Sequence, residues 1–384
     1  MTPGLPYKRL GAFYLFWFGS LGALLPYWSL FLRDAGHSAE RIGWMFAILM
    51  GTKMVAPNVW GWVADHHGHR LRIIRLATGV AAVFFLGMPF VDPFWALALL
   101  MVGYGFFANA ALPQFEAVTF NHLGTREREY GRIRLWGSVG FIGSVLVLGR
   151  LLDIFPSTLV PWWILAALTG LFAVALSVPD PGDGRPARHG ERLRQVLKRP
   201  QVASLLAVCF LVQFSHGPYY AFFSIYMEGH GYTRGTIGVL WALGVIAEIG
   251  VFAMLPQLID RFGLRGLMLG AVAATALRWS LLAAFPERAG VVVPAQVLHL
   301  ASFGIHHGVA VSLVHRLFRG RLQGRGQALY SSLSFGAGGA VGSLCSGYVW
   351  AAAPPAAIYV MAAAAAGLAW LIALAGLRHL PGRA

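Results

Sequence analysis

Five charged side chains stand inside otherwise apolar stretches of this sequence, and their chemistry needs explaining first. They are two acids and three bases: Glu116, Glu248, Lys53, Arg134 and Arg278. An unpaired charge is strongly unfavourable in hydrocarbon, so such residues are expected to face a shared aqueous cavity or one another. Acids and bases in that setting can bind a polar solute, and a carboxylate can also carry a proton. Pairing that only fixes helix packing is the alternative for each of them.

Polar and aromatic residues near these charges add candidates for a binding site. Trp241 lies seven residues before Glu248, and therefore on the same helical face. Tyr220 and His216 belong to the aromatic run SHGPYYAFF (215–223), and their rings could contact a planar substrate. We expect Trp241, Tyr220 and His216 to bind substrate together with Lys53, Glu116 and Arg134, although a lone buried histidine is more often a packing residue.

The elements that must position these residues are membrane-spanning helices. Of the 384 residues, 57% are hydrophobic and only 12% are charged, and the mean hydropathy is +0.64. A soluble domain carries roughly 25% charged residues. Apolar blocks long enough to cross a bilayer predict twelve helices. The expected spans are 10–32, 42–64, 73–91, 95–121, 133–152, 159–178, 202–227, 236–259, 266–286, 291–314, 325–350 and 355–377.

The formal net charge of +15 could indicate a nucleic-acid-binding protein, but the positions of the charges argue against it. Most of the 30 Lys and Arg residues fall in the termini and the even-numbered loops. This bias follows the positive-inside rule and predicts that both termini are cytoplasmic. Cys209 and Cys345 lie in different apolar blocks, so we expect neither a disulfide nor a metal site.

An internal repeat divides the chain in two. At an offset of 195 residues, Asp65, Gly68 and Arg70 overlay Asp260, Gly263 and Arg265, and other matches at the same offset include Gly36 with Gly231. The Pro-, Gly- and Arg-rich stretch 179–201 separates the copies. We therefore expect six-helix bundles over 1–178 and 202–384, joined by a cytoplasmic linker at 179–201, with the substrate site at the repeat interface.

The sequence GWVADHHGHRLR (61–72) resembles the loop 2–3 signature of the major facilitator superfamily. Gly61, Asp65, Gly68 and Arg70 match it, and Leu71 replaces a common basic residue. The resemblance implies a gating motif in which an acid and a base at helix ends hold one conformation until transport breaks the pair. Asp260, Gly263 and Arg265 form a degenerate second copy. Helix capping alone is the alternative for Asp65 and Arg70.

A closer resemblance, to proton-linked permeases of the lactose permease type, covers nearly the whole chain. VGYGFFANAALPQFEAVTF and YGRIRLWGSVGF are similar to helices four and five of that family, where a glutamate pairs with an arginine near the sugar. The matching residues here are Glu116 and Arg134. Glu248, Arg278 and His299 match residues of the C-terminal half, and the resemblance implies proton coupling for these three. Where that family has a second protonatable glutamate, this chain has Ser302.

The overall pattern is closer still to the phenylpropionate permease group, and a proton symporter in a bacterial inner membrane is the expected function. The interior charges sum to +1, which favours an aromatic carboxylate as substrate. Acid–base pairs of the sugar-permease kind favour a sugar or nucleoside instead, and a drug exporter is a further alternative. Ser302 also leaves an uncoupled facilitator open. Beyond this small solute, protons and the lipid bilayer, we expect no cofactor, no nucleic acid and a monomer. No motif of an enzyme or an ATP-driven pump is found in the sequence.

Overall fold

The computed structural model describes residues 5–180, 196–318 and 322–378, and these residues form helices and short connections without a β-strand. The prediction of an all-α membrane protein is confirmed. Most of the linker predicted at 179–201 lies outside the described residues. The α-helices are α1 (Tyr7–Asp34), α2 (Ala39–His67), α3 (Arg70–Gly87), α4 (Phe94–Leu123), α5 (Tyr130–Leu152), α6 (Leu159–Ser177), α8 (Pro200–Gly229), α9 (Arg234–Ala284), α10 (Ala289–Val297), α11 (His306–Leu317), α12 (Gln323–Ser331), α13 (Gly339–Ala352) and α14 (Ala357–Gly376).

Short helical segments interrupt or extend some of these helices. Met88–Phe90 (η1) and Glu127–Glu129 (η2) are 3₁₀ turns, whereas Leu300–Ile305 (η3) and Ser332–Gly338 (η5) are π-helical. Segment η3 joins α10 to α11, and η5 joins α12 to α13. Each π segment therefore lies in the middle of a longer helical run, a position where π-bulges often accompany functional sites.

Ten helical stretches of the described chain are long and apolar enough to cross a membrane. One of them, α9, is interrupted at Gly263, where the backbone leaves helical geometry (φ 69°, ψ 160°). The parts before and after this break correspond to two of the expected spans. The run α12–η5–α13 covers the span expected at 325–350. The number of spans therefore agrees only approximately with the prediction of twelve. The agreement depends on whether α9 is counted as one span or two, and on whether the interrupted run is counted.

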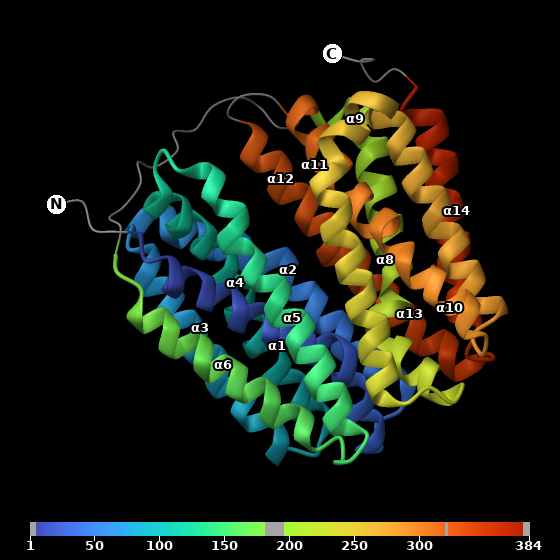
Figure 1. Ribbon diagram of the computed structural model, residues 1–384, viewed down its shortest axis with the longest axis horizontal. Coiled ribbons are helices and arrows are strands. Elements are labelled where there is room, and N and C mark those ends of the chain that lie inside the picture. Colours follow the sequence, from blue (N-terminus) through green and yellow to red (C-terminus); the bar gives the residue numbers. More distant parts are fainter. Residues whose placement is uncertain (1–4, 181–195, 319–321, 379–384) are drawn as a thin grey trace. The chain divides into compact units, whose positions relative to one another are not determined.

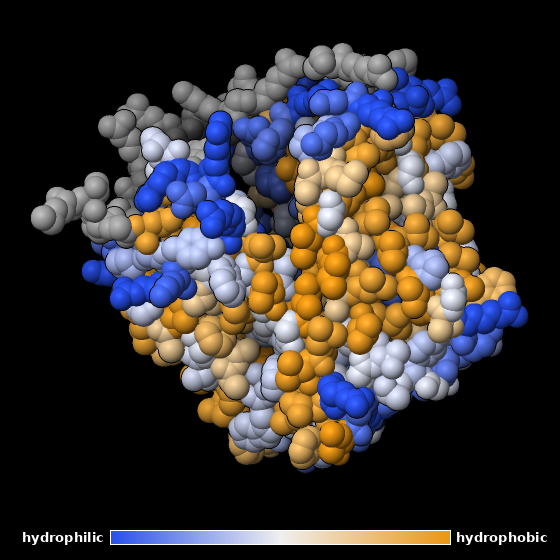
Figure 2. All heavy atoms as spheres, viewed as in Figure 1, coloured by the Kyte–Doolittle hydropathy of each residue, from blue (hydrophilic) through white to orange (hydrophobic). Residues whose placement is uncertain are grey.

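Large apolar side chains are exposed along several helices, as a lipid-facing surface requires. Trp95 is 76% exposed, and Val83 and Leu99 are each 69% exposed. Figure 2 shows hydrophobic residues along the sides of the helices and hydrophilic residues gathered near helix ends. Proline inside α1, α2, α4, α8 and α9 does not end these helices, as is common in membrane helices.

The contacts group the described chain into two compact units. Unit 1 comprises the described residues of Met1–His37, Val55–Ala187 and Thr233–Val239. Within it α1 packs against α5 and α6, and α3 packs against α4 and α6 (Figure 1). Glycines allow the close approach of α1 and α5, since a Cβ at Gly140 would collide with the backbone of Leu15 and one at Gly22 with Phe141 O.

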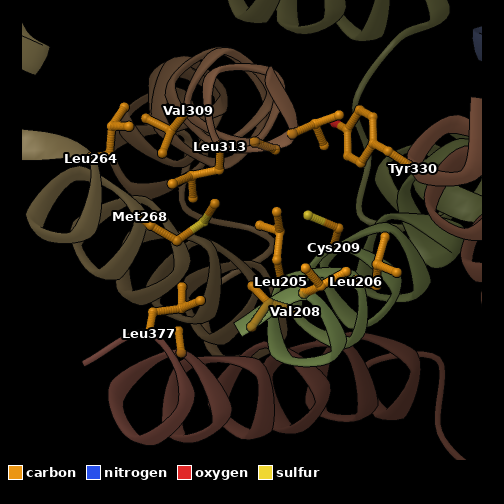
Figure 3. Packing of buried hydrophobic residues seen from close by; sticks show 14 of the residues in the cluster. Leu205, Leu206, Val208, Cys209, Leu264, Met268, Val309, Leu313, Tyr330 and Leu377 are labelled. Carbon is orange, nitrogen blue, oxygen red and sulfur yellow. The ribbon is translucent and has the colours of Figure 1, made fainter. Parts of the chain in front are cut away.

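Unit 2 comprises the described residues of Ser38–Met54, Arg188–Tyr232 and Leu240–Ala384. Helix α8 is its central element and packs against α13, α14 and η5. A hydrophobic cluster, shown in Figure 3, fills the space between α8, α9, α11 and α14; it includes Leu205, Cys209, Met268, Leu313 and Leu377. The expected six-helix bundles, 1–178 and 202–384, stay a prediction.

The backbone preserves the internal repeat. Gly36 and Gly231 adopt φ values of 85° and 86°, and Gly68 and Gly263 adopt 64° and 69°. These left-handed conformations favour glycine, because a Cβ would be strained there. Both pairs are separated by the offset of 195 residues that the sequence predicted, so the two halves have positive-φ glycines at corresponding positions.

Candidate functional site

The strongest concentration of interior polar groups surrounds Arg278, which α9 carries beyond its break at Gly263. The guanidinium is fully buried and donates to three side chains. NH1 lies 2.9 Å from His299 Nδ1 and 3.0 Å from Ser302 Oγ, and NH2 lies 3.1 Å from Gln296 Oε1. These acceptors are neutral groups. Within the described chain, therefore, no carboxylate directly compensates the positive charge of Arg278.

The helical run α10–η3–α11 supplies all three acceptors. Gln296 lies at the end of α10, His299 directly precedes η3, and Ser302 lies inside it. A π-helical turn contains more residues than an α-helical one, so it changes which side chains share a face. Gly244 of α9 faces the ring of His299, where an added Cβ would make an ordinary contact at 3.4 Å.

His299 links Arg278 to Glu248. A guanidinium can only donate hydrogen bonds, so His299 Nδ1 is the acceptor and the proton of the neutral ring is on Nε2. Nε2 lies 3.6 Å from Glu248 Oε2, within ion-pair distance but longer than a hydrogen bond. His299 can take a second proton only if Arg278 moves away from Nδ1. In this arrangement the carboxylate of Glu248 is the group able to accept a proton without breaking a hydrogen bond of Arg278.

Aromatic rings enclose the guanidinium. Its Cζ lies 4.4 Å from the ring centroids of both Tyr219 and Trp279, the geometry of cation–π contacts. The ring of Trp241 lies 4.3 Å from that of Tyr219. The Tyr219 hydroxyl donates to Gln296 Oε1 at 3.1 Å, so the same amide oxygen serves both the phenol and the guanidinium.

The structure places His216 and Tyr220 beside this group. The centroid of the His216 ring lies 5.1 Å from Trp279, 6.3 Å from His299 and 6.0 Å from Tyr220. Six residues predicted from the sequence thus meet in unit 2: Glu248, Arg278, His299, Trp241, Tyr220 and His216. We call these six residues, with Gln296, Ser302, Tyr219 and Trp279, the Arg278 site.

Lys53, predicted to bind substrate, is half-buried on the part of α2 that belongs to unit 2. It forms neither a hydrogen bond nor an ion pair with another residue of the described ranges. Its cationic amine is therefore available to a ligand, but no contact in unit 2 connects it to the Arg278 site.

Glu116 and Arg134 form a separate polar group in unit 1. Glu116 Oε1 accepts a hydrogen bond of 3.2 Å from the Tyr130 hydroxyl. Arg134 lies over the Phe18 ring, with Cζ 3.9 Å from its centroid. The resemblance to sugar permeases predicted a glutamate–arginine pair, but the described residues contain no direct ion pair between these two. The two side chains nonetheless lie close enough to interact electrostatically.

The predicted gating motif forms a clamp in unit 1. Arg70 NH2 lies 2.8 Å from Asp65 Oδ1, and Arg70 NH1 donates to Gln114 Oε1 of α4 at 2.5 Å. Gly68 and His69 both have positive φ, which makes the turn between α2 and α3 tight enough for this pairing. Gly61 lies in α2 with open space beside it. The motif therefore holds α2, α3 and α4 together.

The second copy of the motif repeats the positive φ of the glycine but not the clamp. Gly263 has a positive φ like that of Gly68, but the residue after it does not share the positive φ of His69. Arg265 donates to the Leu374 carbonyl of α14 at 3.4 Å, whereas Asp260 is exposed and has no ion-pair partner within the described ranges. In this half the arginine secures a neighbouring helix through a carbonyl group.

Several residues of these groups were not predicted from the sequence. Gln296 and Ser302 accept hydrogen bonds from Arg278, Trp279 stacks on it, and Tyr130 and Gln114 complete the groups in unit 1. Their residue types are too common in membrane helices to single them out. Two signals were present, because Trp279 directly follows Arg278 and Ser302 replaces an acid of the related permeases.

A distinct cavity in unit 1 contains none of these groups. It has a volume of about 460 Å³ and lies between α1, α5 and α6, lined by residues such as Phe16, Val147 and Trp163. The lining is nearly all apolar, and the Trp163 indole donates to Ser144 Oγ at 2.8 Å. Its chemistry fits hydrocarbon better than a polar solute.

Comparison with known proteins gives this geometry a family context. The model of the MFS_1 like family matches residues 7–361. The chain is 28% identical over 364 residues to a probable 3-phenylpropionic acid transporter of Escherichia coli K12, covering 91% of this chain and 92% of that protein. It is 29% identical to the maltose permease of Geobacillus stearothermophilus, covering 88% and 86%. A crystal structure of a point mutant of the nucleoside transporter NupG has a TM-score of 0.87 at 15% identity and covers 97% of this chain and 100% of that chain.

Proposed function

Because this chain belongs to the MFS_1 like family and is a multi-pass membrane transporter of a small solute rather than an enzyme, we propose that its solute is an aromatic carboxylate. The observation that carries the proposal is the environment of Arg278. The guanidinium is fully buried, its hydrogen-bond acceptors are neutral, and two aromatic rings lie against it. A carboxylate joined to a planar ring complements both the charge and the aromatic surfaces.

A relative of this chain supports the same class of solute. The E. coli protein is named for 3-phenylpropionic acid, which has a carboxylate two carbons from a phenyl ring. Such a molecule could place its carboxylate on Arg278 and its ring among Tyr219, Trp241 and Tyr220. The unpaired amine of Lys53 adds a second cation to the same unit.

A competition between an acid and its amide tests the proposal. 3-Phenylpropionate and 3-phenylpropanamide have nearly the same shape, and only the first is charged. A hydrogen-bonded charge contributes about 1.5–3 kcal/mol, so purified protein should bind the acid about 10- to 150-fold more tightly than the amide. Arg278→Gln should remove this preference, and Arg278→Lys should retain part of it. Equal affinity of the wild-type protein for acid and amide would contradict the proposal.

A sugar or nucleoside is the second candidate. Glu248, His299, Gln296 and Tyr219 offer several hydrogen-bonding groups near one another, which suits hydroxyl-rich ligands. Maltose permease and the NupG nucleoside transporter are similar to this chain over most of its length. Including maltose and a nucleoside in the binding panel decides between the classes. A stabilising effect of either one, without an effect of aromatic acids, would favour this second candidate.

We also propose that transport is coupled to protons through Glu248. In the observed arrangement His299 Nδ1 is occupied by Arg278, which leaves the carboxylate as the proton acceptor. A substrate carboxylate bound to Arg278 would place a second negative charge near Glu248 and thereby change how strongly Glu248 holds its proton. Ser302, in place of an acid, accepts a hydrogen bond from Arg278, and its hydroxyl does not ionise at neutral pH.

Proteoliposomes that hold a pH indicator test this coupling. With wild-type protein, adding substrate outside should move protons inward together with the solute. Glu248→Gln should abolish this proton movement while substrate exchange across the membrane continues. Unchanged proton movement in the variant would refute the role of Glu248. We further propose a monomer in a bacterial inner membrane with both termini cytoplasmic, as the distribution of Lys and Arg supports.

A further inference from the structure

A second polar group lies in the core of unit 2, outside the hydrogen bonds of Arg278. It consists of Gln213 and His216 on α8, His306 at the start of α11, and Ser334 in η5. All four residues are at most 1% exposed. Five of their side-chain nitrogen and oxygen atoms lack a hydrogen-bond partner among the described residues, whereas Ser334 Oγ has the weak thiol of Cys209 beside it as a partner. The five atoms are Gln213 Nε2 and Oε1, His216 Nε2, and His306 Nδ1 and Nε2.

Contacts in unit 2 place these residues near one another. His216 lies within electrostatic range of His306 and of His299. Gln213 precedes His216 by one helical turn, and its Cβ is 3.2 Å from the position that a Cβ on Gly338 of η5 would take. Ser334 of the same π segment lies within hydrogen-bonding reach of Cys209, which precedes Gln213 by one turn of α8. The four residues thus follow the seam where α8 meets η5 and α11.

So many buried and unpaired polar atoms are costly. Each one loses its hydrogen bonds to water on burial, and the combined penalty is comparable with the whole stability of a domain. Native proteins leave few such atoms, and internal water commonly supplies the missing partners. Both π segments of the described chain border this group, and π-helical turns are frequent at functional sites.

The chemistry of the atoms identifies the ligand. His216 Nδ1 lies 2.8 Å from the Val212 carbonyl and must donate to it, so Nε2 of the neutral ring is an acceptor. Gln213, Ser334 and neutral His306 each present both a donor and an acceptor. An anion would require donors only and a metal ion lone pairs only. Water both donates and accepts, and therefore satisfies the whole set.

We propose that Gln213, His216, His306 and Ser334 bind a group of internal water molecules in the core of unit 2. His216 joins this water to the Arg278 site, since its ring lies 6.3 Å from that of His299. The hydrophobic cluster that contains Cys209, Leu205 and Leu313 (Figure 3) borders this group at Cys209. Where protons are coupled to transport, which rests on the function proposed above, this water gives a proton at the Arg278 site polar partners beyond His216.

X-ray radiolysis of the full-length protein in nanodiscs tests for this water directly. Hydroxyl radicals formed from a bound water oxidise side chains next to it, even when these are fully buried. Cys209 lies beside Ser334, whereas Met268 is equally buried in the hydrophobic cluster on α9; both are 0% exposed. Mass spectrometry should find Cys209 oxidised and Met268 unmodified. If Cys209 is as unreactive as Met268, the proposal is wrong.

A stability measurement gives a second, independent test. If water bonds to His306, His306→Leu leaves that water with fewer partners and should lower the melting temperature. Oxidation of Cys209 should fall in the same variant and fall further when Gln213→Leu is added. A dry site predicts the opposite, because removing an unpaired buried imidazole should raise the melting temperature. Neither readout requires transport, so failure of the proposed substrate or proton coupling would leave this result unaffected.

Discussion

His299 offers the sharpest test of how Arg278 and Glu248 communicate, because its two ring nitrogens have different partners. Nδ1 accepts from Arg278 at 2.9 Å, and Nε2 faces Glu248 at 3.6 Å. Asparagine places an amide where Nδ1 lies, and glutamine places one where Nε2 lies. His299→Asn therefore keeps an acceptor for Arg278 and loses the link to Glu248. His299→Gln does the reverse.

The magnitudes follow from the charges involved. A hydrogen bond with a charged partner contributes about 1.5–3 kcal/mol, which corresponds to about 10- to 150-fold in an equilibrium constant. His299→Gln misplaces the guanidinium that we propose binds the substrate carboxylate, so substrate affinity should fall by this factor. His299→Asn should change affinity by less than about 10-fold, since its acceptor for the charged donor stays.

Proteoliposomes carrying each variant separate the two effects. Equilibrium exchange of labelled substrate reports binding and the alternation of the carrier, and an internal pH indicator reports proton movement. We expect His299→Asn to exchange substrate with little proton movement, and His299→Gln to need far more substrate for either process. Equal behaviour of the two variants, or full proton coupling in His299→Asn, would refute this account of the ring nitrogens.

Three further predictions concern single side chains. Ser302→Ala removes an acceptor that lies 3.0 Å from the buried guanidinium. The melting temperature should fall, because a charged hydrogen bond of about 1.5–3 kcal/mol is lost. An unchanged melting temperature would mean that another group replaces the hydroxyl. Gly140→Ala drives a Cβ into the backbone of α1 and should cost about 1–3 kcal/mol by thermal unfolding, while Gly143→Ala on the same helix, with open space around it, should be nearly neutral. Asp65→Asn breaks a partly exposed ion pair worth about 0.2–1 kcal/mol, so the melting temperature should hardly change. A large loss of transport in this variant would support gating. Unchanged transport would argue for a purely structural role.

Much of the fold could be predicted from the sequence because the bilayer permits few solutions. Helices must satisfy their own backbone hydrogen bonds, so long apolar blocks identify them with errors of only a few residues. The expected span 291–314 corresponds to the run Ala289–Leu317. The turn at Gly68 and its copy at Gly263 were also predictable, since a fixed offset connected them before their φ angles were known.

Partners across the site were harder to predict. Charge alone singled out Glu248 and Arg278, but charge does not reveal that His299 separates them. Neutral acceptors such as Gln296 were missed for a similar reason, because tertiary packing selects them and no local pattern does.

The paired left-handed glycines have a consequence for the ancestry of this chain. The side chains of the two motif copies have diverged, since Asp65 pairs with an arginine and Asp260, within the described ranges, does not. The φ angles at Gly36 and Gly231, and at Gly68 and Gly263, agree within 5° in each pair. Polar contacts can be exchanged one residue at a time, whereas the sign of φ at a tight turn cannot change gradually. The backbone is therefore the more faithful record of the internal repeat that the sequence shows.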